Sequence, residues 1–150
     1  MGVYTNRLNV ITMLITLIIS AVILTIVSGF SKAIMDLSED KKLKFKNEFF
    51  WLKAYSWKNK WKLDDKSNPI RVNGKYVEKF FGSSRWFVMF TDAWHLFGFF
   101  YNRSNKAVGV CIGILSATYS WWFLVGFIVT SIIYAATFHL FYNSKKYRKL

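Results

Sequence analysis

The chain has 150 residues, of which 53% are hydrophobic and 20% aromatic, and its net charge is +13. A chain this short and this apolar at both ends excludes a pair of soluble domains and predicts one membrane unit with a polar insert. Its single cysteine, Cys111, excludes an intramolecular disulfide.

Two long segments lack charged residues. Residues 8–31 and residues 107–144 contain no Lys, Arg, Asp or Glu. As a helix rising about 1.5 Å per residue, the first segment is roughly 36 Å long and exceeds the roughly 30 Å hydrocarbon core. We therefore expect an all-α integral membrane protein. Residues 1–31 are predicted to be an uncleaved transmembrane signal anchor, because the apolar run exceeds the about 7–15 residues of a cleaved signal.

The basic residues predict the orientation. Residues 32–85 hold fourteen Lys and Arg, against Arg7 alone before the first span. The positive-inside rule places this insert in the cytoplasm and the N-terminus outside. The tail, residues 143–150, adds four basic residues and reaches the cytoplasm only if residues 86–142 form a two-span helical hairpin. The sequence thus predicts three transmembrane helices in the inner (cytoplasmic) membrane.

The turn of this hairpin has two candidate positions. A turn at residues 102–106 would leave residues 107–142 as a single helix of about 54 Å. A turn at residues 116–120 gives a third span that starts at Trp121 and Trp122, which are typical interfacial anchors. We favour the second position.

Small residues in the spans predict close helix packing. Thr12, Thr16 and Ser20 recur at four-residue spacing, and Gly109 and Gly113 form a small-xxx-small pair. Such faces allow helices to approach closely within one chain, or between this chain and another copy or another membrane protein.

The insert contains a cationic, Trp-rich segment. Residues 41–63 place aromatic side chains at helical spacing, with lysines between them, and predict an amphipathic helix lying on the bilayer surface. Each lysine near anionic phospholipids contributes about 1 kcal/mol. The predicted membrane-interface residues of this segment are Trp57, Trp61, Lys58, Lys60 and Lys62.

Basic and aromatic residues also occur together on nucleic-acid surfaces. The insert, however, has fourteen basic and seven acidic residues, a net charge of only +7, and it contains no nucleic-acid motif. Binding to the membrane surface already explains this composition. We therefore expect the lipid bilayer as the partner and no nucleic acid.

The candidate chemistry lies at Asp92, His95 and His139. Asp92 and His95 share a helical face at i, i+3, and His139 lies near the same end of the predicted bundle. A carboxylate and two imidazoles are suitable ligands for a divalent metal such as zinc, and the same groups fit a proton relay. The alternative that we favour is structural: Asp92 caps the helix together with Thr91 and hydrogen-bonds His95.

Three segments resemble a pattern found in small membrane proteins of bacteria and their phages that have no assigned activity. The matching segments are SWKNKWK at 56–62, FGSSRWFV at 81–88 and TDAWHLF at 91–97, with FHLFY at 138–142. In that pattern the position of His139 is often acidic. The resemblance implies a shared membrane architecture and no particular chemistry.

The function that we expect is a structural or interaction component at the inner leaflet. A phage holin-like lysis protein is one alternative, because three spans and a basic cytoplasmic tail resemble one holin class, although holin loops are short. A membrane-embedded metal-dependent enzyme using Asp92, His95 and His139 is the other. The sequence has no GxSxG or HExxH motif.

Overall fold

The computed structural model describes residues 2–40, 42, 48–118 and 121–144, and it is mostly helical. A long helix, α1 (Gly2–Glu39), is followed by the insert. The insert holds a one-turn helix, α2 (Glu48–Trp51), and a two-stranded antiparallel hairpin, β1 (Arg71–Val72) with β2 (Lys75–Tyr76). Helices α3 (Ala93–Thr118) and α4 (Trp122–Tyr142) complete the described chain. Short 3₁₀ turns lie at Lys53–Tyr55, Lys58–Lys60 and Val88–Phe90.

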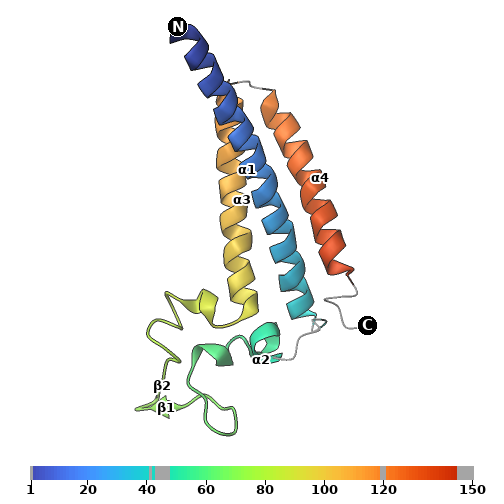
Figure 1. Ribbon diagram of the computed structural model, residues 1–150. Coiled ribbons are helices and arrows are strands. Elements are labelled where there is room, and N and C mark those ends of the chain that lie inside the picture. Colours follow the sequence, from blue (N-terminus) through green and yellow to red (C-terminus); the bar gives the residue numbers. More distant parts are fainter. Residues whose placement is uncertain (1, 41, 43–47, 119–120, 145–150) are drawn as a thin grey trace.

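Helices α1, α3 and α4 form a bundle in which α1 and α4 run in the same direction and α3 runs in the opposite direction (Figure 1). The insert lies at the end of the bundle where α1 and α4 finish. At the other end, α1 projects beyond α3 and α4 toward the N-terminus. The insert is therefore mounted on one end of a three-helix body.

The distribution of buried residues in the bundle is the reverse of that in a water-soluble protein. Helix α1 buries mainly small side chains, among them Ala21, Thr25, Ser28, Ser31 and Ser38. Large apolar side chains of α1 and α4 are exposed, including Ile11, Ile15, Ile19, Ile23, Leu124, Phe127, Ile128 and Ile132. In the most apolar windows of Asn9–Glu39 and Leu124–Tyr142, only 11% and 6% of the residues are buried.

These two helices are long and apolar enough to cross a membrane. Exposed large apolar side chains with small residues at the contacts are typical of helices that face lipid and pack on one another. The pattern therefore indicates a membrane location. It also explains why so few of the large apolar side chains in this hydrophobic chain are buried.

The close approach of α1 to α4 depends on Gly29. A Cβ atom at this position would lie 2.9 Å from the Tyr134 carbonyl oxygen and 3.0 Å from Thr137 Cβ. On the α3 side, Ser28 Oγ donates a hydrogen bond of 2.7 Å to Asn105 Oδ1. Small residues at successive positions of α1 therefore contact both neighbouring helices.

These helix contacts do not involve the residues that the sequence predicted to form packing faces. Thr12 and Thr16 are exposed, and Thr16 donates to the Thr12 carbonyl oxygen within α1. Cβ atoms added at Gly109 and Gly113 would meet nothing within 4 Å. Gly109 and Gly113 therefore do not lie at close helix contacts within the described part of the chain. Association with another copy or another protein through them stays a prediction.

The chain reverses between the end of α3 at Thr118 and the start of α4 at Trp122. The candidate turn at residues 102–106 is wrong because these residues lie inside α3; of the candidate at 116–120, residues 116–118 are helical and residues 119 and 120 are outside the described part. Trp121 is exposed at this tip, and the Trp122 side chain is likewise outside what the structure describes. Helix α3 starts at Ala93 rather than near residue 86.

The prediction of an amphipathic helix over residues 41–63 is wrong for its described part, residues 48–63. After α2, Leu52 is extended, with φ −97° and ψ 127°, and Trp61 is extended again. Leu52 is buried against Ile34 and Leu37 of α1. The Lys62 amide donates to the Val77 carbonyl oxygen at 2.9 Å. Contacts with α1 and with residues 77–79 therefore replace a continuous helix.

The predicted interface residues of this segment consequently do not share one apolar face. The Trp61 ring stacks on Tyr76 with a centroid distance of 5.2 Å, whereas Trp57 is exposed. Lys58 Nζ donates to the Ser67 carbonyl oxygen at 3.3 Å, and Lys60 and Lys62 flank the pairing with residues 77–79. Binding of these residues to anionic phospholipids stays a prediction.

Candidate functional site

Asp92 lies at the junction of the insert and α3, and it is fully buried. Its Oδ1 accepts the backbone N–H of His95 at 3.0 Å. Its Oδ2 accepts the hydroxyls of Thr91 at 2.8 Å and Ser56 at 3.1 Å. His95 Nδ1 lies 2.8 Å from the same oxygen. One carboxylate therefore joins three side chains.

The local sequence explains this geometry. Asp92 immediately precedes α3, and its side chain accepts the third amide of the helix, which is the role of an N-cap. The prediction that Asp92 caps the helix and pairs with His95 is confirmed. Ser56 was not predicted, because it lies 36 residues earlier and a serine within a presumed amphipathic helix gives no signal. Through Ser56 the carboxylate ties the insert to α3.

The charge of Asp92 is stabilised where it is buried. Burial raises the pKa of this carboxyl, but hydrogen bonds from His95 and Thr91 outweigh it and hold the pKa below the ordinary value of 3.8. Asp92 is therefore ionised at neutral pH. An ionised carboxylate accepts the Nδ1 proton of His95, which fixes the imidazole ring in one orientation.

Ser56, His95 and Asp92 have the residue types of a catalytic triad without its geometry. Ser56 Oγ lies 3.0 Å from His95 Nδ1, the nitrogen that also contacts Asp92. In a triad the serine bonds the opposite ring nitrogen, Nε2, so that the histidine takes the serine proton. Ser56 is instead a hydrogen-bond donor to the carboxylate. The arrangement positions an imidazole and does not activate a nucleophile.

His139 does not join Asp92 and His95, and its side chain is exposed on α4. Among the residues that the structure describes, no three His, Cys, Asp or Glu side chains gather closely enough to hold a metal ion. A carboxylate on Nδ1 is nevertheless the arrangement that orients a metal-binding histidine through Nε2. Zinc binding at Asp92, His95 and His139 stays a prediction.

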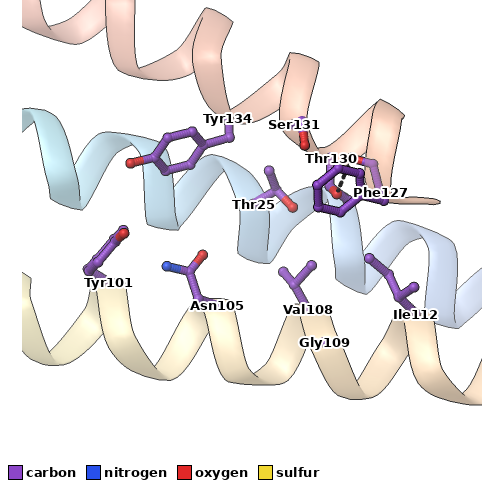
Figure 2. Close-up of a pocket in the computed structure, with 10 residues that line it drawn as sticks. All are labelled: Thr25, Tyr101, Asn105, Val108, Gly109, Ile112, Phe127, Thr130, Ser131 and Tyr134. Atoms are coloured by element: carbon purple, nitrogen blue, oxygen red, sulfur yellow. Dashed lines mark hydrogen bonds between the residues drawn. The ribbon is translucent and has the colours of Figure 1, made fainter. Parts of the chain in front are cut away.

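A groove of about 400 Å³ lies between α3 and α4, with α1 beside it (Figure 2). The hydroxyls of Thr25 and Thr130 donate to the carbonyl oxygens of Ala21 and Gly126 in their own helices. The polar residues that line the groove carry no formal charge: Thr25, Tyr101, Asn105, Thr130, Ser131 and Tyr134. Together with the apolar lining of Val108, Ile112 and Phe127, these residues suit the groove to an uncharged, mostly apolar ligand.

A third feature is the aromatic loop, which we define as residues 80–90. Phe81 is 87% exposed and Trp86 is 76% exposed, and Phe87 and Phe90 are exposed as well. This set was missed as a site because residues from 86 onward were assigned to the second span. The available signal was five aromatic residues within eleven positions, together with Lys79 and Arg85.

The Glu78 carboxylate holds this loop in shape. Its Oε2 accepts the Gly82 amide at 2.9 Å, and its Oε1 accepts the Ser84 amide at 3.2 Å and the Ser84 hydroxyl. Ser83 Oγ donates to the Lys60 carbonyl oxygen at 2.7 Å. Gly82 has φ +74°, a conformation that favours glycine. The exposed aromatic rings are therefore mounted on a defined turn.

The same hydrogen bonds predict a pH dependence. Donation from the Ser84 hydroxyl and the Gly82 amide lowers the pKa of Glu78 below its ordinary value of 4.5. A lowered folded-state pKa stabilises the folded protein above the unfolded-state pKa, and the stabilisation is lost as the pH falls through the folded-state pKa. We expect Glu78→Gln to lower the thermal unfolding midpoint at about pH 7 and to have a smaller effect at an acid pH at which the folded-state carboxylate is protonated.

Thermal unfolding of parent and variant in the same detergent measures this difference. Asp65→Asn is the matched control, because Asp65 is an exposed carboxylate of the insert for which a small effect is expected at both pH values. An equal effect of Glu78→Gln at the two pH values would contradict the role of the ionised carboxylate.

Comparison with known proteins identifies no function, so a function must be assigned from the geometry of the chain. No family model, no curated protein and no solved structure matches the chain. The candidate site thus consists of the Asp92 junction, the neutral groove and the aromatic loop. Two of these three features lie in or beside the insert.

Proposed function

We propose that the protein is a multi-pass component of the cytoplasmic membrane whose insert is a folded interaction platform at the inner leaflet. The observation that carries this proposal is the buried Asp92 junction, which joins the insert to α3. A loop that served only to connect two spans would need no buried carboxylate. The insert also carries most of the charge of the chain, so it is the part suited to polar partners.

Further contacts support a platform that is fixed to the bundle. Leu52 packs against Ile34 and Leu37 at the end of α1. The Ser38 hydroxyl donates to the Trp51 carbonyl oxygen at 2.5 Å, and Lys53 Nζ lies 2.6 Å from Glu39 Oε1. Apolar, neutral polar and charged contacts therefore all hold the insert on the same end of α1.

Three crossings are proposed because of the direction of the helices. Since α1 and α4 run the same way, the chain must return between them, and α3 is the helix that does so. Its polar residues Arg103 and Lys106 flank Asn105, which contacts Ser28 of α1. Ser28 precedes Lys32 by only about 6 Å along the helix axis. Long cationic side chains at this level reach the headgroups.

Reporter fusions test the topology. Because the basic insert and the basic tail favour the cytoplasmic side, we expect fusions at Ser67 and at Leu150 to report the cytoplasm and a fusion before Met1 to report the periplasm. A periplasmic report at Leu150 alone would exclude three crossings. Reversed reports at all three sites would keep the three crossings and exclude the proposed orientation.

A further inference from the structure

The aromatic loop has large apolar side chains and no protein surface that covers them within the described residues. Phe87 and Phe90 contact each other, with ring centroids 6.4 Å apart, while Phe81 and Trp86 are the two most exposed large apolar side chains in the described part of the chain. An exposed apolar patch that is held in shape marks an interaction site.

The position of the loop favours the bilayer. Residues 80–90 lie beside the first turn of α3, whereas the β1–β2 hairpin lies farther from the bundle (Figure 1). Only Thr91 and Asp92 separate Phe90 from the start of α3, and Asp92 is fixed by its buried hydrogen bonds. The loop is therefore held beside the end of the bundle, on the headgroup side of the spans under the proposed function.

The chemistry of the loop matches that region. Tryptophan and other aromatic side chains concentrate at membrane interfaces, and basic side chains there contact anionic headgroups. Lys79 and Arg85 are exposed and flank the aromatic residues. A protein partner would have to be recruited to this surface, whereas lipid is present beside the end of the bundle as soon as the helices insert.

We propose that the aromatic loop inserts Phe81 and Trp86 into the headgroup region of the bilayer that α1 and α4 cross. This inference depends on the proposed function, because it requires the bundle to be in the membrane. It assigns the interfacial contact of the insert to residues 80–90 rather than to Trp57 and Trp61. The loop then sets the height and tilt of the insert against the inner leaflet.

Spin labels on single cysteines in the full-length protein test the proposal. In a Cys111→Ala background, labels are placed at Trp86→Cys, at Val72→Cys in the β1–β2 hairpin and at Ile132→Cys on the exposed face of α4. The protein is reconstituted into nanodiscs that contain anionic phospholipid, and collisions with oxygen and with a water-soluble nickel complex are compared. Oxygen is enriched in the bilayer and the nickel complex is excluded from it.

We expect the ratio of oxygen to nickel collisions to be highest at position 132, intermediate at 86 and lowest at 72. A label at 86 should lie in the headgroup region, shallower than the label at 132. A water-like ratio at 86 with a bilayer-like ratio at 132 would overturn the loop proposal and leave the membrane assignment intact. A water-like ratio at 132 would overturn the proposed function itself.

A second label position protects the test against a misfolded variant. Phe81 is even more exposed than Trp86, so Phe81→Cys disturbs the fewest contacts and should give the same intermediate ratio. Each variant must unfold at the same temperature as the Cys111→Ala parent. If correctly folded variants give water-like ratios at both 81 and 86, the loop does not contact lipid.

Discussion

Asp92→Ala should destabilise the protein more than the truncation of any carboxylate in the insert. The substitution removes the N-cap of α3, which costs about 1 kcal/mol. It also leaves the hydroxyl of Ser56 and the ring Nδ1–H of His95 without their buried acceptor, at a further cost of about 1–3 kcal/mol. The measurement is chemical or thermal unfolding in detergent micelles, followed by circular dichroism.

Two variants make this experiment specific. Asp65→Ala removes an exposed carboxylate from the same insert and should change the free energy of unfolding by less than about 0.5 kcal/mol. Asp92→Asn keeps one side-chain oxygen for the cap but loses the charge, so its effect should fall between those of the two alanine variants. Equal stability of Asp92→Ala and Asp65→Ala would show that the junction does not hold the insert.

Gly29→Ala should separate α1 from α4. The added Cβ would meet the Tyr134 carbonyl oxygen at 2.9 Å, and backbone atoms of a packed helix cannot move aside locally. Overpacking of this kind typically costs about 1–3 kcal/mol. The expected result is a lower unfolding midpoint and a longer distance between spin labels on the two helices.

Gly109→Ala is the matched control within the bundle. It adds the same methyl group to a helical glycine that has open space around it. Because alanine favours the helix over glycine by roughly 0.5–1 kcal/mol, this variant should be neutral or slightly more stable. A loss of stability in Gly109→Ala as large as in Gly29→Ala would indicate a second contact at this face, as expected if it packs against another copy.

The helices were predictable because each depends on residues close together in the chain. The uncharged runs at 8–31 and 107–144 lie within α1 and within the hairpin, and the Asp92 cap follows from two residues three positions apart. The insert was not predictable in the same way. Its segment at 48–63 has the spacing of an amphipathic helix, but the buried Leu52 and the pairing with residues 77–79 decide its path.

In the candidate site, too, contacts between residues close together in the chain were predictable and contacts between distant residues were not. The pairing of Asp92 with His95 is a local contact and was predicted, whereas Ser56 reaches Asp92 only through the fold of the insert. The face of α1 that packs was misplaced, because Thr12 and Ser28 look equally suitable in the sequence. The structure distinguishes them, because Thr12 is exposed whereas Ser28 is buried and donates to Asn105 of α3.

This projection of α1 gives the molecule a taper. One end presents the cross-section of a single helix, about 10–12 Å wide, and the other end presents three helices together with the insert. In a bilayer crossed by α1 and α4, such a wedge displaces more lipid from one leaflet than from the other. We therefore expect its insertion energy to depend on the curvature of the membrane and to be lowest where the leaflet at its broad end is expanded.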